Sequence, residues 1–363
     1  MQVSLWGYYG INYGDDIMMI ELLNYFNKRK VRVQLIDLFN ANLEEQLKGK
    51  YDNLQIINFN LLNYKEKKKV IRECSKNKIN LWGGGTIFTD VDGDGNFKWF
   101  SLIKLFGGKI GYVGVGIGKL TRIKRVIKTK LLLNWSSLTI FREKKSLNRA
   151  KALFKKGDYL LAEDISYKYF ERFKLPESEL KSRKKYLLIT WRNLNKYLDK
   201  NKELIIMEKI ADKCSEYIGS GRINNIILAA LDINNDLTSC QELKSLFENR
   251  NIESSIICSN NIDENSRLIL EANIHISGRL HGSVASEFFK TPTISLSYSP
   301  KMNYFYESIK TNNYLDIYTT NFEEDELFNN ILNNKKSVDF SSIVKKSEEN
   351  FRYIENFLFD NKN

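Results

Sequence analysis

Several residue types that mark whole classes of protein are scarce in this chain of 363 residues. It has four cysteines, which are widely spaced and form neither a CxxC pair nor a cluster with histidine. Their spacing argues against a zinc site and against a disulfide framework, and it is typical of a reducing compartment. Only three prolines occur, which we interpret as a compositional habit without functional meaning.

Long hydrophobic runs are also lacking. No apolar segment approaches the ~20 residues that a helix needs to span a bilayer. The first residues do not have the basic-then-apolar layout of a secretory signal. We therefore expect a cytoplasmic protein, either soluble or peripheral at the inner face of the plasma membrane.

Acidic residues are outnumbered, because 56 lysines and arginines face 44 aspartates and glutamates, for a net charge of +12. Such a surplus favours an anionic partner, namely a phosphorylated metabolite, an acidic lipid headgroup or a nucleic acid, although it would also serve solubility alone. No nucleic-acid fold signature is present and the aromatic residues are not interleaved with the basic run. We therefore expect no nucleic-acid partner.

The order of apolar segments predicts an α/β fold, because short apolar runs alternate with helical patterns, as in a parallel sheet covered on both faces. The first half has expected strands at 3–6, 31–36, 54–59, 79–82, 110–115, 138–142 and 158–162. The second half has expected strands at 186–191, 226–231, 255–258, 273–277 and 293–297. The main expected helices are 15–27, 165–173, 203–218, 237–249, 263–271, 282–289 and 342–359.

The chain is too long for one ordinary core and fits two domains. A polar, proline-containing segment at residues 173–185 separates the two halves and is the expected linker. We predict two doubly wound, Rossmann-like domains at residues 1–176 and 183–340, an interdomain cleft, and a closing C-terminal helix within 341–363. In such sheets, ligands bind at the carboxyl ends of strands.

Two glycine-rich loops follow expected strands in the first domain. The loop at residues 7–16 leads into a helix, whose free N–H groups favour anions, and Asp15 would act there or simply cap the helix. The loop's glycine spacing does not fit a dinucleotide motif. The second loop, at residues 83–90, has three consecutive glycines, which indicates a backbone that lines a site. Asp90 in this loop would orient a sugar hydroxyl or organise the loop.

Charged residues also follow strands in both domains. Arg142 and Glu143 end a strand of the first domain, and Arg192 ends the first strand of the second. An arginine at the carboxyl end of a strand can hold phosphate or carboxylate through two hydrogen bonds, although each could also be an ordinary surface arginine.

The sharpest candidate is the segment 277–282, Ser-Gly-Arg-Leu-His-Gly, between a strand and a helix. His281 would act there as a general acid or base, Arg279 would offer donors to an oxyanion, and Gly282 and Ser283 would offer free N–H groups. The only other histidine, His275, lies inside the strand, and we interpret it as structural.

Lys301 follows the next strand, and together with Arg192 and Arg279 it would form an electropositive pocket that needs no metal and no cofactor. Such a pocket favours a small donor with two anionic groups.

Four motifs together resemble the polysaccharide pyruvyl transferase family. They are Gly-Tyr-Tyr-Gly-x-Asn-x-Gly-Asp at 7–15, Gly-Gly-Gly-x-x-x-x-Asp at 83–90, Ser-Gly-Arg-Leu-His-Gly at 277–282 and Ser-Tyr-Ser-Pro-Lys at 297–301. The resemblance implies a GT-B-like fold. It also implies transfer of the enolpyruvyl unit of phosphoenolpyruvate onto sugar hydroxyls, with a cyclic pyruvate ketal and phosphate as products.

The resemblance also implies roles for individual residues. Arg279 and His281 match the family's Arg-x-His and would be catalytic. The donor would be bound by the C-terminal domain through Arg192, Gly282, Ser283 and Lys301. The acceptor side would comprise Asn12, Asp15, Gly84, Gly85, Asp90 and Glu143. The base would be Asp15, Asp90 or Glu143, and Glu143 departs from the aspartate that the family often has at this position.

The acceptor would be a saccharide or a lipid-linked oligosaccharide of a bacterial surface polysaccharide. The basic stretch at residues 119–135 would then contact an anionic membrane, or else be a solvated helix face.

A nucleotide-sugar glycosyltransferase of the same architecture is the alternative function. Many retaining members carry two glutamates at a fixed spacing, and here Glu287 and Glu271 are followed at that spacing by Ser295 and Arg279. Inverting members do not need the pair, so this alternative stays open. A non-enzymatic binding protein is a weaker alternative.

Overall fold

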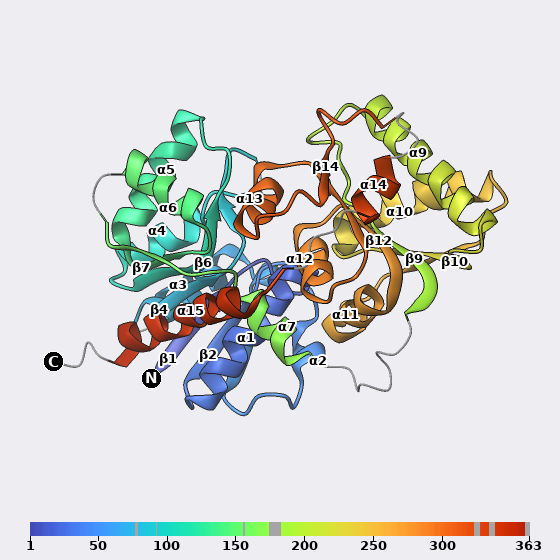
Figure 1. Cartoon of the computed structure of the whole chain (residues 1–363). Coiled ribbons are helices and arrows are strands. Elements are labelled where there is room, and N and C mark those ends of the chain that lie inside the picture. The colour runs from blue at the N-terminus through green and yellow to red at the C-terminus, as the bar shows by residue number, and fades with distance from the viewer. Residues whose placement is uncertain are drawn as a thin grey trace. The chain divides into compact units, whose positions relative to one another are not determined.

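The computed structural model describes residues 1–76, 79–91, 93–154, 157–173, 183–322, 327–333 and 338–359. The chain divides into two compact units, coloured along the sequence in Figure 1. The first comprises Met1–Ile11, Asp15–Arg172 and Ser341–Asn363, and the second comprises Asn12–Gly14 and Phe173–Phe340. The centre of the expected linker, residues 174–182, and the predicted domain boundary at residue 176 lie outside the described residues.

The first unit is built on an eight-stranded sheet with all pairings parallel. Its strands follow the order β3-β2-β1-β4-β6-β7-β8, and β5 pairs with β6 beside this path. The strands are β1 (Gln2–Trp6), β2 (Arg32–Asp37), β3 (Leu54–Asn58), β4 (Ile79–Gly83), β5 (Thr86–Phe88), β6 (Lys109–Ile117), β7 (Ser136–Phe141) and β8 (Tyr159–Leu161).

Helices cover both faces of this sheet, which explains why its strands are mostly apolar, with a few buried polar residues such as Ser4, Gln34 and Asn80. Alternate residues of β1 enter two different buried clusters, because successive side chains of a strand point to opposite faces. Val3 and Leu5 join the cluster that includes α1 and α15, whereas Trp6 packs edge-on against Phe59 and Phe100. Figure 1 shows α4, α5 and α6 grouped on one side and α1 and α15 on the other.

The helices of the first unit are α1 (Tyr13–Lys28), α2 (Leu43–Leu47), α3 (Tyr64–Ser75), α4 (Phe97–Leu105), α5 (Ile123–Trp135), α6 (Lys144–Leu153), α7 (Ser166–Arg172) and α15 (Ser341–Phe359), with the short 3-10 helix η1 (Phe59–Leu61). The last of them, α15, lies against α7. Ser347 and Asn350 donate hydrogen bonds of 2.7 Å to the carbonyls of Asp164 and Glu163. The end of the described chain therefore packs into the first unit.

The second unit has a six-stranded parallel sheet in the order β11-β10-β9-β12-β13-β14. Its strands are β9 (Lys184–Thr190), β10 (Asn225–Ala229), β11 (Ser254–Ile257), β12 (Ala272–Ser277), β13 (Thr293–Ser297) and β14 (Tyr314–Asp316). Its helices are α9 (Lys200–Gly219), α10 (Ile233–Glu248), α11 (Ile262–Glu271), α12 (Leu280–Phe288), α13 (Pro300–Ser308) and α14 (Leu327–Asn333).

Both sheets reverse their strand order at one point, between β1 and β4 in the first unit and between β9 and β12 in the second. In doubly wound sheets, ligands bind outside the carboxyl ends of the two strands at such a point. The loops at 7–16 and 83–90 follow β1 and β4, and Arg192 and the segment 277–282 follow β9 and β12. The topology therefore brings the predicted site segments to the switch points.

The predicted fold class, two doubly wound parallel sheets, is confirmed, and each expected strand has a counterpart within a few residues. The sequence patterns do not predict β5, β14, α13 or α14, which are short, polar or interrupted. All four cysteines are free thiols. None of the described helices is long and apolar enough to cross a membrane.

Candidate active site

The segment after β12 forms the start of a helix, not the loop that we expected. Arg279 is the N-cap of α12, which begins at Leu280, so His281 and Gly282 lie in its first turn. The N–H of Ser283 donates to the Arg279 carbonyl at 2.9 Å, and its hydroxyl is buried between Ser277 and Ser295. The prediction that the Ser283 N–H is free is therefore wrong. Only the first N–H groups of a helix lack an intrahelical partner, and that of Ser283 has one.

Arg279 is buried in an ion pair that the sequence analysis did not foresee. Its Nε donates to Asp236 Oδ2 at 2.8 Å, and its Nη2 contacts both Asp236 and, at 3.2 Å, Asp232. Burial opposes the guanidinium charge, but the two carboxylates outweigh burial and raise the pKa of Arg279. The pair ties the start of α12 to α10, and the predicted contact of Arg279 with an oxyanion stays a prediction.

Glycines allow this helix start to approach the strand ends closely. A Cβ on Gly278 would lie 3.0 Å from the Arg192 nitrogen, and one on Gly282 would lie 2.8 Å from Ser277 Oγ. Neither approach leaves room for a side chain, so these glycines bring α12 against β9 and β12.

His275 is fully buried, as predicted for a structural histidine. Its Nε2 is 2.9 Å from Thr190 Oγ1 and its Nδ1 is 2.5 Å from Ser286 Oγ. His281, by contrast, is partly exposed at the first turn of α12. The two histidines therefore have different environments, one inside the sheet and one at its edge.

Arg192 and Lys301 meet at a buried tyrosine that the sequence analysis missed, Tyr298. Arg192 donates to Tyr298 Oη at 2.9 Å and to Tyr197 Oη at 3.0 Å, and its guanidinium lies over both rings. Lys301 Nζ lies 5.4 Å from the centre of the Tyr298 ring. The only sequence signal for this residue is its place in the motif at 297–301.

The pKa of Tyr298 reflects the positive potential at these strand ends. Burial would raise it, but the charges of Lys301, Arg192 and Arg279 outweigh burial and lower the pKa to about 8. Cations that favour a phenolate inside the protein also favour an anionic ligand nearby.

Gly84, Gly85 and Asp15 come together at the switch point of the first unit. Gly84 and Gly85 have φ angles of +75° and +84°, which favour glycine. A Cβ on Gly85 would lie 3.2 Å from Asp15 Oδ1, so the Gly85 backbone and the Asp15 carboxylate are neighbours. Asn12 belongs to the second unit with residues 13 and 14, and there it forms a β-bridge with Asp232.

Asp90 organises its loop. Its carboxylate accepts hydrogen bonds of 2.7 to 2.9 Å from the Thr121 hydroxyl and from the N–H groups of Thr121 and Arg122. Burial opposes ionisation, but these hydrogen bonds hold the pKa of Asp90 below its usual value. These contacts join the loop at residues 83–90 to residues 121 and 122, and the contact of Asp90 with a sugar hydroxyl stays a prediction.

A second group of charges follows β7 and β8. Arg142 is buried and donates to Asp164 at 2.7 Å, and its Nε lies 4.0 Å from the Glu143 carboxylate, which accepts from Ser146 at 2.5 Å. Burial raises the pKa of nearby Glu163 to about 7, against the opposing charge of Lys346 and with added repulsion from Asp164 and Glu143. Glu163, which the sequence analysis did not name, thus titrates near neutrality.

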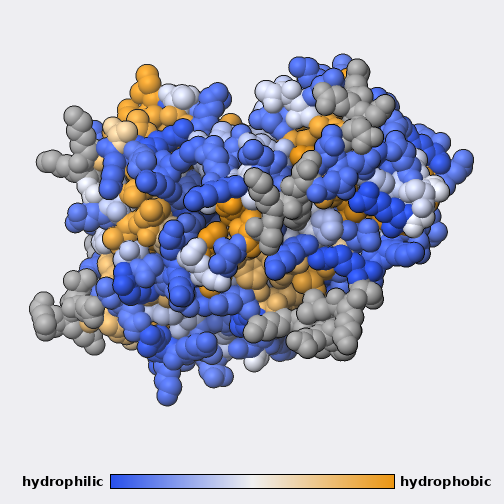
Figure 2. Space-filling model, viewed as in Figure 1, coloured by the Kyte–Doolittle hydropathy of each residue, from blue (hydrophilic) through white to orange (hydrophobic). Residues whose placement is uncertain are grey.

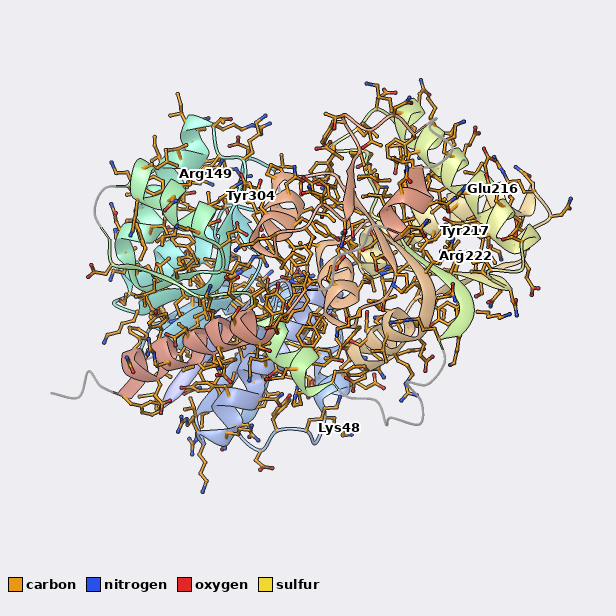
Figure 3. All side chains as sticks on the ribbon, viewed as in Figure 1. Lys48, Arg149, Glu216, Tyr217, Arg222 and Tyr304 are labelled. Carbon is orange, nitrogen blue, oxygen red and sulfur yellow. The ribbon has the colours of Figure 1, made fainter. Side chains whose placement is uncertain are left out.

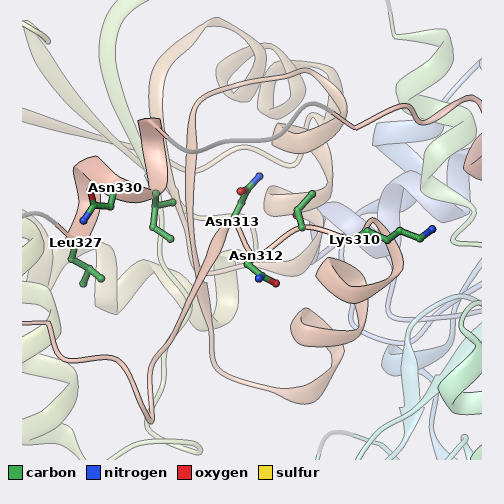
Figure 4. A pocket seen from close by; sticks show the side chains of 7 residues that line it. Lys310, Asn312, Asn313, Leu327 and Asn330 are labelled. Carbon is green, nitrogen blue, oxygen red and sulfur yellow. The ribbon is translucent and has the colours of Figure 1, made fainter.

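A pocket of about 320 Å³ lies elsewhere in the second unit, before β14 and beside α14 (Figure 4). It is lined by Lys310, Thr311, Asn312, Asn313, Leu327, Asn330 and Ile331. None of the predicted site residues contributes to it. Among the described residues, no group of three or more His, Cys, Asp or Glu side chains could hold a metal ion.

Comparison with known proteins adds a family and a fold. A sequence model described as polysaccharide pyruvyl transferase matches residues 12–300. Among proteins with curated descriptions, none matches the sequence.

The similar solved structures include UDP-GlcNAc 2-epimerases. The enzyme from Methanocaldococcus jannaschii, in complex with UDP-GlcNAc and UDP, has a TM-score of 0.66 at 13% identity and covers 98% of this chain and 99% of its own. The Rickettsia bellii enzyme has a TM-score of 0.65 at 13% identity, and the match covers 99% of this chain and 96% of that enzyme. The Neisseria meningitidis enzyme has a TM-score of 0.58 at 12% identity, and the match covers 99% of this chain and 100% of that enzyme. At such low identity these likenesses show the fold alone, and the predicted GT-B-like fold is confirmed.

Tyr298 should ionise well before an ordinary tyrosine, whose pKa is about 10. Because folding lowers this pKa to about 8, ionisation adds to the free energy of unfolding as pH rises from about 8 to about 10, and adds nothing below that range. Ultraviolet difference spectroscopy of the folded protein should detect one phenol that ionises near pH 8 and is missing in Tyr298→Phe.

Tyr217→Phe is the matched control, because burial raises the pKa of Tyr217 to about 12 and its removal leaves the early transition in place. A wild-type protein without any early transition would contradict the positive potential described here.

Proposed function

Since this chain belongs to the polysaccharide pyruvyl transferase family and is therefore a transferase that acts on a sugar acceptor, we propose that it uses phosphoenolpyruvate as donor. The enolpyruvyl group would be moved onto a sugar of a bacterial surface polysaccharide or its lipid-linked precursor. The products would be a pyruvate ketal and phosphate.

One observation carries the proposal for the donor, namely the convergence of Arg192 and Lys301 on Tyr298 at the carboxyl ends of β9 and β13. Phosphoenolpyruvate has a phosphate and a carboxylate, and both are ligands that arginine and lysine prefer. The N–H of Gly282, in the first turn of α12, adds a donor of the kind that binds phosphate at helix ends. We therefore assign donor binding to the second unit.

The transfer would proceed by an addition and then a substitution at one carbon, C2 of the donor. Protonation of the methylene carbon makes C2 of the donor cationic, and a sugar hydroxyl attacks it and forms the first C–O bond. A second hydroxyl of the same sugar then displaces phosphate and closes the ketal. Of the two hydroxyl protons, one is balanced by the new methyl group and the other leaves with phosphate. His281 is the group that we propose to deliver the proton to carbon or to the departing phosphate.

We assign acceptor binding to the first unit. The Asp15 carboxylate beside Gly85 and the Glu143 carboxylate after β7 are the bases that we propose for the attacking hydroxyl. The backbone at Gly84 and Gly85 would approach the sugar, because glycine leaves it uncovered. Asp90 would act through the loop that it holds, and Arg279 through the helix that it ties to α10.

Release of phosphate from phosphoenolpyruvate, measured across a panel of capsule, O-antigen and cell-wall saccharides, tests this function. In His281→Ala the turnover should fall ~10²–10⁴-fold, which is the usual contribution of a general acid or base. Its melting temperature should stay near that of the wild type, and mass spectrometry should detect the ketal only with active protein.

Two results would contradict the proposal. Full activity in His281→Ala would remove this residue from the mechanism. Thermal stabilisation by nucleotide sugars and not by phosphoenolpyruvate would favour a glycosyltransferase, since only a ligand that binds the folded state stabilises it.

Arg192→Met should raise the KM for phosphoenolpyruvate, by about tenfold for a lost ionic contact of ~1.4 kcal/mol. Arg222→Met is the matched control. The Arg222 guanidinium also lies 4.7 Å from the centre of a tyrosine ring, that of Tyr217, near the end of α9 (Figure 3). An equal rise of KM in both variants would show that the effect is not specific to the proposed donor site.

We also propose that α5 contacts an anionic membrane. Ile123 and Ile127, one helical turn apart, are 76% and 53% exposed. Figure 2 shows hydrophobic atoms protruding where Figure 1 places this helix. Lys124 and Lys130 lie on the same helix, whereas Lys128 pairs with Asp94 at 2.9 Å and has a structural contact. Exposed apolar residues flanked by lysines are typical of a helix that lies on a membrane surface.

Sedimentation with vesicles tests this contact. The wild type should bind vesicles that contain anionic lipid, with ~1 kcal/mol from each basic residue near the surface, and should bind neutral vesicles less. Ile123→Ser/Ile127→Ser should reduce the binding. Leu204→Ser/Ile205→Ser, which removes two other exposed apolar residues, 41% and 51% exposed, from α9, is the control and should bind as the wild type. Equal binding by all three proteins would exclude α5 as the contact.

A further inference from the structure

His281 lies directly against Gly14. A Cβ built on Gly14 would overlap Nδ1 and Cγ of the imidazole and would lie 2.5 Å from its Cε1. Real Cβ atoms do not approach other atoms so closely. The imidazole therefore occupies the space that any side chain at residue 14 would need.

Gly14 cannot easily move aside, because its neighbours are bound to the second unit, to which residues 12–14 belong. The N–H of Tyr13 donates to the Leu231 carbonyl at 2.9 Å, and the Tyr13 hydroxyl is 2.8 Å from Ser266 Oγ. The Asn12 side chain accepts from the Gly14 N–H at 3.0 Å. These contacts hold the backbone of residue 14 in place beside α12.

Asp232 supports both sides of the histidine, through its backbone on one side and its carboxylate on the other. Asp232 forms the β-bridge with Asn12 and contacts Arg279 Nη2 at 3.2 Å. Arg279 is the N-cap of α12, on which His281 lies two residues further on. Two residues therefore set the position of the imidazole. Arg279 fixes the start of α12, which carries His281, and Gly14 packs against the imidazole ring.

We propose that Gly14 is a positioning residue, whose missing side chain gives the His281 imidazole its place at the end of β12. Its expected effect on turnover rests on the function proposed above, whereas the contact itself does not. Because Cγ as well as Nδ1 would be overlapped, a methyl group at residue 14 cannot be accommodated by flipping the ring. The side chain would have to rotate about its Cα–Cβ bond, and a misplacement of about 1 Å can lower a rate ~10²-fold.

Gly14→Ala tests the proposal. The residue lies in α1 without a positive φ angle, so alanine is favoured by backbone propensity, and only the overlap opposes it. Turnover of phosphoenolpyruvate should fall ~10²-fold, with kcat affected more than KM. Gly219→Ala, at the end of α9 where a Cβ would meet nothing within 4 Å, is the control and should keep wild-type turnover.

Proton NMR of the imidazole signals gives a readout that does not depend on turnover. The chain has two histidines, so His281→Ala assigns both signals. In Gly14→Ala the chemical shift of the His281 signal should change, while that of buried His275 stays in place and shows that the second unit is folded. An unchanged His281 signal would overturn the proposal.

A double-mutant cycle decides whether Gly14 acts through the histidine. In the His281→Ala background, Gly14→Ala should cost little further turnover, because residues that act through one contact are not additive. Fully additive losses would overturn the proposal. If His281→Ala itself has wild-type turnover while Gly14→Ala still moves the His281 signal, the positioning contact stands and the function proposed for the histidine fails.

Discussion

The buried ion pair of Arg279 with Asp232 and Asp236 is the constraint on which the second unit's candidate site depends. It joins the N-cap of α12 to the start of α10, and through the bridge of Asp232 to Asn12 it also holds the segment 12–14. A buried charge whose partner is removed is strongly destabilising, so the three side chains depend on one another. His281, on the first turn of α12, takes its position from this pair.

The cations of the second unit therefore divide into two kinds of environment. Arg279 is paired with carboxylates, and this ion pair holds the start of α12 in position. Arg192 and Lys301 lie against the ring of Tyr298, whose lowered pKa reflects the positive potential that they create. An aromatic face attracts a cation without cancelling its charge as a carboxylate does. This difference favours Arg192 and Lys301, more than Arg279, for direct contact with an anionic donor.

Most of the fold could be predicted from the sequence, because buried parallel strands are short, mostly apolar runs and the covering helices repeat their apolar residues with a different period. The short strands β5 and β14 carry too few residues for such a pattern. The glycines at 84 and 85 were also informative, since their positive φ angles demand glycine. The start of α12 was predicted too late, because no capping serine, threonine, aspartate or asparagine precedes it and Arg279 takes that position.

The sequence by itself determined the two doubly wound sheets, the family resemblance and the place of the histidine, arginine and glycine motifs after particular strands. Only the tertiary structure decided the partners of those side chains. Asp232 and Asp236 lie far from Arg279 along the chain, and Tyr298 lies far from Arg192, so nothing in the sequence pairs them. Contacts of this kind arise where parallel strands end at one sheet edge, and the order of strands along that edge is a property of the fold. Gly14, remote in sequence, lies against His281 because its neighbours Asn12 and Tyr13 bond to Asp232 and Leu231, which follow β10.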